Sequence, residues 1–185
     1  MALSSDRNTP RRDGVQFEFP VAAGVKIYAG AVVVVDAGYA KPGATGTGLV
    51  VLGIAEAPVD NTVGDAGDVT VAVRRGVFRL ENSAAGDAIT RADIGKACYL
   101  VDDQTVAKTS DEGARSVAGV IADVDADGVW VDLTCETAAV AALQLAIDEA
   151  VANTTDGLAA LNTAVGVPYT DPDSLSTRVT ALENA

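Results

Sequence analysis

Three aspartates alternate along one short stretch of the chain. Asp123, Asp125 and Asp127 precede Gly128 in the run DVDADG. Alternate carboxylates followed by a glycine form the first half of a calcium-binding loop, where acidic oxygens converge on a hard cation. Thr134 occupies the position of the bidentate glutamate, and strand-like rather than helical residues flank the run. We therefore interpret the run as a solvated Asp-Gly hairpin turn, with a metal site at the three aspartates as the weaker alternative.

Other residues of chemical interest do not form a recognisable catalytic set. Asp102 with Asp103, and Asp111 with Glu112, have the residue type for acid and base roles in glycoside hydrolysis, but both pairs fall in expected turns, where water solvates them. The chain has no histidine, the commonest general base and a common zinc ligand. We expect no enzymatic activity and no cofactor.

Two further groups of residues are better explained by structural roles than by chemistry. Gly43, Gly46 and Gly48 match neither phosphate-binding pattern, which indicates a flexible hairpin loop. Arg74, Arg75 and Arg79 lie near Glu81 beside strand residues, where an ion-paired or solvated sheet face explains them better than anion binding does.

Cys98 and Cys135 lie within apolar runs, 37 positions apart. Buried reduced thiols are the favoured interpretation, and a disulfide or a metal site is the alternative.

The chain is acidic, with 13 Lys plus Arg against 26 Asp plus Glu and a net charge of −13. This charge repels polyanions, so we expect no nucleic-acid partner. Residues 1–12 carry Arg7, Arg11 and Arg12 against Asp6, so that a basic arm at +2 precedes a body at −15. The sequence predicts an extended N-terminal arm over residues 1–14 that docks on an acidic neighbour.

No stretch of about 18 apolar residues is present for a membrane span, and the first residues lack the apolar core of a signal peptide. We expect synthesis in a cytoplasm and no membrane partner.

Short Val-rich runs bounded by Gly, Asp, Asn and Pro recur through residues 15–134, which is typical of a small antiparallel β-barrel or sandwich. The runs are VQFEF, AVVVV, GLVVLGIA, DVTVAV, GVFRL, KACYLV and GVWVDL. A weak duplication relates residues 33–41 to 99–108, and residues 52–60 to 118–126. Two similar halves facing each other would close one barrel or sandwich; the alternative is that short Val-rich strands simply look alike.

From Thr137 alanine dominates, and the sequence predicts a helical oligomerisation tail over residues 135–185. Apolar positions and one threonine follow coiled-coil spacing, although TTDG at 154–157 could divide the segment into two helices. They are Ile147, Val151, Thr154, Leu158, Leu161 and Val165.

The last predicted helix carries Leu175, Val179 and Leu182 on one stripe. Its segment RVTALE, from Arg178 to Glu183, resembles the short trimerisation motif of parallel coiled coils, in which the arginine of one chain reaches the glutamate of the next. A simple amphipathic docking helix is the alternative.

Residues from about 10 to 134 resemble the capsid decoration, or cement, proteins of tailed bacteriophages. The segments that carry the resemblance are GVFRLE at 76–81, IGKACYLVDDQTVAKT at 94–109 and ARSVAGVIADVDADGVWVDL at 114–133. The tail extends beyond what is typical of this family.

The resemblance implies a structural protein on the capsid exterior of a virion, which binds the major capsid protein as a homotrimer and stabilises the shell by joining neighbouring capsomers. Arg7, Arg11 and Arg12 would then form a capsid-binding arm. The alternatives are a trimeric head-binding, baseplate or tail-fibre component, and a carbohydrate-binding β module.

Overall fold

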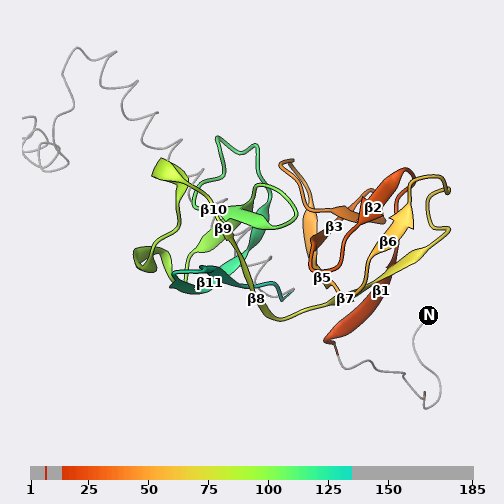
Figure 1. Ribbon diagram of the computed structural model, residues 1–185, viewed down its shortest axis with the longest axis horizontal. Helices are drawn as coiled ribbons and strands as arrows, with labels where there is room; N and C mark the ends of the chain where they lie inside the picture. Colours follow the sequence, from red (N-terminus) through yellow and green to blue (C-terminus); the bar gives the residue numbers. More distant parts are fainter. Residues whose placement is uncertain (1–6, 8–13, 135–185) are drawn as a thin grey trace, which may run out of the picture. The chain divides into compact units, whose positions relative to one another are not determined.

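The computed structural model describes Arg7 and residues 14–134 and is mainly β, as predicted (Figure 1). The predicted helical tail over residues 135–185 lies outside the described residues. Within the described residues, no helix is long and apolar enough to cross a membrane. The strands are β1 (Gln16–Pro20), β2 (Val25–Ile27), β3 (Val32–Asp36), β4 (Tyr39–Pro42), β5 (Val50–Ala55), β6 (Val59–Asn61), β7 (Thr70–Arg74), β8 (Val77–Asn82), β9 (Ala97–Leu100), β10 (Thr105–Ala107), β11 (Val117–Asp125) and β12 (Gly128–Asp132), with short 3-10 helices η1 (Ala85–Asp87) and η2 (Arg91–Asp93).

Ten of these strands form two groups that pair in the same order. The first group is a sheet in the order β1-β7-β5-β3-β4, and the second is a closed barrel in the order β10-β8-β12-β11-β9. Thus β1 matches β8, β7 matches β12, β5 matches β11, β3 matches β9 and β4 matches β10. The remaining strands, β2 and β6, pair with each other. The predicted duplication is confirmed by the strand pairing.

The match between the halves extends to a single irregularity. The register of β3 against β5 shifts at a β-bulge, where Leu52 of β5 has no partner on β3. The register of β9 against β11 shifts in the same way, and Ala118 of β11 has no partner on β9. Gly53 and Gly119 follow these extra residues. A Cβ atom would lie 2.3 Å from the Arg74 carbonyl oxygen at Gly53, and 2.2 Å from a carbonyl oxygen of β12 at Gly119. Both bulges therefore need glycine.

The sequence left open one barrel or one sandwich closed by the two halves, and the strand pairing contradicts a single barrel. Each half pairs its own strands, including the long-range pairs of β1 with β7 and of β8 with β12, and only the second half closes. The barrel is also not wholly antiparallel, since β8 and β10 pair in parallel where the barrel closes.

A backbone hydrogen bond that helps to close the barrel has no counterpart in the first half. In the first half, Ala22 N–H donates to the Ala40 carbonyl at 3.0 Å. At the matching position of the barrel, Ser83 N–H donates to the Val106 carbonyl at 2.9 Å. Two residues earlier, Glu81 N–H donates to the Gln104 carbonyl at 2.8 Å. Pro20 occupies the position matching Glu81 and has no N–H to donate. Only an isolated bridge at Val21 joins β1 to β4, and most of β1 keeps an open edge.

Strands β3 and β5 are buried on both faces. Val33, Leu52 and Ala55 belong to the core of the first half, whereas the alternate side chains Val32, Val34, Val51 and Ile54 pack with the core residues of the barrel. Burial on both faces explains why these strands read as continuous apolar runs. Both halves belong to one compact unit of the chain.

The glycine-rich loop between β4 and β5 is not free, contrary to the predicted flexible loop. Ala44 forms an isolated bridge with Asp102 of the barrel, and Thr45 Oγ1 donates to the Val101 carbonyl at 2.8 Å. Ser116 Oγ donates to the Gly46 carbonyl at 2.7 Å. Because glycine has no side chain, Gly43 lets the loop approach the β9–β10 hairpin closely. A Cβ at this position would lie 3.1 Å from the Asp102 carbonyl oxygen.

Candidate functional site

Strand β1 is an edge strand of the first sheet, and most of its outer edge is open. Val15 accepts a hydrogen bond from Arg75 N–H, and Val21 N–H donates to the Val69 carbonyl. With the antiparallel register of β1 against β7, these bonds direct the backbone groups of odd-numbered residues toward β7. The N–H and C=O groups of Gln16 and Glu18 therefore face the open edge.

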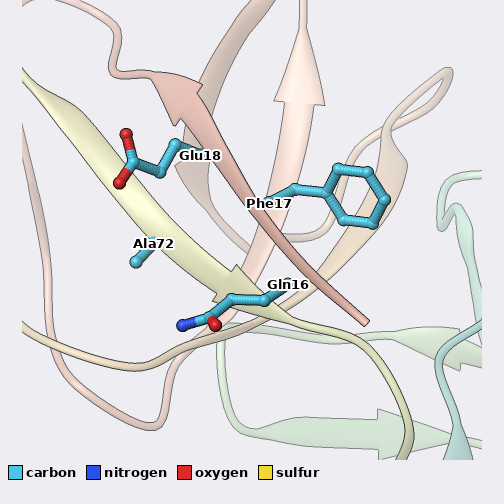
Figure 2. A pocket seen from close by; sticks show the side chains of 4 residues that line it. All are labelled: Gln16, Phe17, Glu18 and Ala72. Carbon is cyan, nitrogen blue, oxygen red and sulfur yellow. The ribbon is translucent and has the colours of Figure 1, made fainter. Parts of the chain in front are cut away.

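A recess of about 360 Å³ lies beside this edge, lined by Gln16, Phe17, Glu18 and Ala72 (Figure 2). The side chains of Gln16 and Glu18 lie on one face of β1, and Phe17 points to the other face. Gln16 donates to the Glu56 carboxylate, which also pairs with Arg74 Nε at 2.6 Å. No described residue forms an ion pair or hydrogen bond with the Glu18 carboxylate, so a negative charge lies beside the open backbone groups of Gln16 and Glu18.

On the inner face, aromatic packing holds β1 in place. The Arg75 guanidinium lies 4.5 Å from the centre of the Phe17 ring, and the Phe17 and Phe19 ring centres are 6.2 Å apart. Arg75 Nε also donates to the Leu52 carbonyl at 3.3 Å. These contacts fix the strand while its outer edge stays accessible.

The sequence reasoning missed this edge, although Pro20 gave a usable signal. A proline inside a strand pattern indicates an edge strand, because proline has no N–H to donate to a neighbouring strand.

The three aspartates of the candidate metal site each bind different partners. Asp125 Oδ1 accepts from the N–H groups of Asp127 and Gly128 at 2.8 and 3.0 Å, and its Oδ2 accepts from Trp130 Nε1 at 2.6 Å. Asp123 lies 3.8 Å from Arg91, and Asp127 lies 3.3 Å from an arginine of β8. The bond from Trp130, followed by the backbone bonds, lowers the pKa of Asp125.

The DVDADG run is therefore a hairpin turn, as expected, between β11 and β12. Within residues 14–134, no three acidic or thiol side chains gather closely enough to hold a metal ion.

The carboxylate pairs also have local structural roles. Asp102 Oδ1 accepts from the N–H groups of Gln104 and Thr105, at 2.9 and 2.7 Å, which closes the β9–β10 turn. Asp111 and Glu112 adopt the left-handed conformation, with φ values of 53° and 54°. Asp111 also lies 3.8 Å from the Arg115 guanidinium.

The arginines of the predicted sheet face have different partners. Arg74 pairs with Glu56 and Arg79 with Asp127, whereas Arg75 packs on Phe17. Ion pairing therefore accounts for Arg74 and Arg79, as the sequence predicted.

Buried polar groups elsewhere stabilise the fold. Asp93 is 6% exposed and accepts from Thr90 N–H and Oγ1, at 3.0 and 2.8 Å, and from Lys96 Nζ at 2.9 Å. The bond from Lys96, then those from Thr90, lower the pKa of Asp93 to about 2. Asn61 is also buried, and its amide donates to the carbonyls of Ala22 and Asp65.

Cys98 is a buried free thiol, as predicted. Burial raises its pKa to about 12, and its sulfur lies 3.6 Å from the Gly119 carbonyl oxygen. The neutral thiol acts as a small apolar side chain of the barrel core.

The remaining predicted site residues lie outside the described part of the chain, except for Arg7, which is exposed. They are Arg11, Arg12, Cys135, Leu175, Arg178, Val179, Leu182 and Glu183.

The comparisons with known proteins find no family model, no curated protein and no solved structure that matches this chain.

Proposed function

We propose that the chain is a structural protein of a tailed-phage virion, which binds the outer surface of the capsid as a homotrimer and cements neighbouring major capsid protein subunits. The observation that carries this proposal is the location of the segments that resemble decoration proteins. Residues 77–81 of the first segment lie in β8, residues 94–109 include the β9–β10 hairpin, and residues 114–133 include the β11–β12 hairpin. Together these segments supply all five strands of the closed barrel.

The use of polar groups supports an adhesive rather than a chemical role. Asp93, Ser116 and Asn61 are the buried polar residues of the described part, and each is bonded to neighbouring groups of the fold. The hairpin aspartates likewise bind their own turn and nearby arginines. These residues bind groups of the fold itself, and the proposed binding falls to the surface of the module.

Trimerisation would make weak surface contacts effective. A three-fold protein on a three-fold site presents each contact three times, so that the first contact raises the effective concentration of the second and third. The RVTALE segment in the tail is the sequence feature behind this part of the proposal. The basic arm with Arg7, Arg11 and Arg12 would add a contact to an acidic patch on the capsid protein.

The test is to mix the purified full chain with undecorated capsids and image the particles by electron microscopy. The proposal expects density above the three-fold positions of the shell. Density at the tail, or none on the capsid, would refute capsid cementing.

A variant lacking residues 2–12 serves as the comparison in this experiment. It should coat the capsid more weakly while sedimenting as the same oligomer as the full chain. Unchanged coating would show that the arm does not contribute to capsid binding.

A further inference from the structure

The open backbone groups of β1 are few and have a defined direction. Gln16 and Glu18 turn their N–H and C=O groups away from β7. Pro20 has no N–H to donate, and beyond it Val21 forms the isolated bridge with β4. An extended segment of another chain can therefore lie along this edge as an added strand. In antiparallel orientation, the residues directly opposite Gln16 and Glu18 would each exchange two hydrogen bonds with them.

The face of β1 that carries the Glu18 side chain has an excess of negative charge. Arg74 lies on this face, but its Nε is 2.6 Å from the Glu56 carboxylate, to which Gln16 also donates. Arg74 is therefore already paired, whereas the Glu18 carboxylate forms no ion pair or hydrogen bond with another described residue. A cationic side chain directly opposite Glu18 would lie on the same face and neutralise it.

The strand next to β1 leaves room for such a side chain. Ala72 of β7 lies directly opposite Glu18, and alanine carries only a methyl group. The recess of about 360 Å³ lies here, with the side chains of Gln16 and Glu18 on the same side of β1 (Figure 2). A long arginine or lysine side chain on an added strand can therefore extend across Glu18 toward the recess.

The opposite face of β1 suits apolar side chains. Phe17 and Phe19 lie on this face and are partly buried, and the Arg75 guanidinium lies 4.5 Å from the centre of the Phe17 ring. Successive side chains of a strand point to opposite faces, so the residues before and after the basic one would lie on the side of the two phenylalanines. The edge therefore favours a basic residue between two apolar residues.

A second copy of the same edge is a poorer partner. Pairing two β1 edges would place two Glu18 carboxylates on one short ladder, and neither edge brings an unpaired cation.

We propose that the open edge of β1, with the recess at Ala72, binds an extended segment of another protein as an added antiparallel strand. The bound segment carries an arginine or lysine directly opposite Glu18 and an apolar residue on each side of it. This docking site goes beyond the proposed function and does not depend on it.

The test titrates the isotope-labelled full chain with the peptide acetyl-Thr-Val-Arg-Val-Thr-amide and follows the backbone amides by NMR. The sample contains no capsids, so the outcome is independent of capsid binding. The amides of Gln16 and Glu18 should shift most, with a dissociation constant of about 1 mM or below, since the ladder is short.

Modified peptides separate the charge from the ladder. The peptide with glutamate in place of arginine should bind about five- to tenfold more weakly, because like charges then face each other. N-methylation of the arginine removes the N–H that would donate to the Glu18 carbonyl and should weaken binding at least about tenfold. N-methylation of the following valine, whose N–H points away from β1, should change the affinity by less than about threefold.

Protein variants test the role of Glu18. Glu18→Lys should reverse the preference, so that the glutamate peptide binds more tightly than the arginine peptide. Glu112→Lys makes the same charge change in a turn that is not part of this edge, and it should keep the preference of the unmodified chain.

The proposal would be overturned if millimolar arginine peptide left the Gln16 and Glu18 amides unshifted, or if the arginine and glutamate peptides bound equally. Shifts at these amides that follow protein concentration without peptide would assign the edge to a second copy. Binding only by a variant lacking residues 2–12 would assign it to the chain's own basic segment. Either assignment would also overturn the proposal.

Discussion

Gly53 and Gly119 lie at matching bulges, and each has a carbonyl oxygen of the neighbouring strand where a side chain would begin, at 2.3 and 2.2 Å. The contact is with backbone, which cannot rotate away as the end of a flexible side chain can. The two positions therefore fix how closely β5 approaches β7 and how closely β11 approaches β12.

We predict that Gly119→Ala lowers the free energy of unfolding by about 1–3 kcal/mol, the cost of overpacking a closely packed site. Gly53→Ala should act in the same direction. Gly86→Ala is the control, since a Cβ there meets nothing within 4 Å, and it should change stability by less than about 0.5 kcal/mol. Urea unfolding measures all three, and equal stability of Gly119→Ala and the unmodified chain would contradict the bulge geometry.

Asp93 gives the fold a dependence on pH. Its pKa is about 2 in the folded chain, against a usual value of 3.8, because Lys96 and Thr90 hydrogen-bond the ionised carboxylate. A group with a lowered folded pKa stabilises the fold above its unfolded pKa, and this stabilisation is lost as the pH falls through the folded value. The window therefore runs from about pH 4 down to about pH 2.

We predict that Asp93→Asn reduces stability at neutral pH and flattens the decrease in stability between about pH 4 and pH 2. The measurement is the difference in unfolding free energy between the variant and the unmodified chain across this range. Asp60 has a similarly lowered pKa but is present in both proteins, so its contribution cancels. A constant difference across the window would count against the role of Asp93.

At the scale of elements, the halves differ at the closing strands. The parallel pair of β8 and β10 closes the barrel through the bond from Glu81 N–H to the Gln104 carbonyl, which Pro20 cannot make in the first half. One backbone donor thus distinguishes a closed barrel from a sheet with an open edge.

We predict that Glu81→Pro destabilises the chain by about 1–3 kcal/mol, because the Gln104 carbonyl loses its donor. Glu81→Ala keeps the N–H and should cost less than about 0.5 kcal/mol, which separates the backbone bond from the side chain. Faster amide exchange along β10 in Glu81→Pro alone would support the assignment. Similar destabilisation by proline and alanine would contradict it.

The sequence predicted the strands with strong Val-rich runs and the hairpin turn at Asp125, because hydrophobic runs and turn residues are local signals. It did not predict β2 and β6, which have three residues each and no apolar run. The duplication was recognised, but the arrangement of the halves as an open sheet and a closed barrel depends on long-range pairing, such as that of β1 with β7. The role of the loop at Gly43 was also missed, since its partners at Asp102 and Ser116 are distant in the sequence.

At the scale of the whole molecule, a duplicated β module precedes a tail whose RVTALE segment resembles the short trimerisation motif. The candidate site could be anticipated only in part. The sequence indicated a basic arm, whereas the acidic open edge at Glu18 depends on which side of β1 faces β7, and this is a property of the assembled sheet.

The most direct test of the proposed homotrimer is its mass in solution. Sedimentation equilibrium of the full chain should give about 56 kDa, three times the 18.7 kDa of one chain, over a wide range of dilution. Arg178→Glu should weaken this trimer, and adding Glu183→Arg should restore it by reversing the pair. A mass of 18.7 kDa at every concentration would contradict the account.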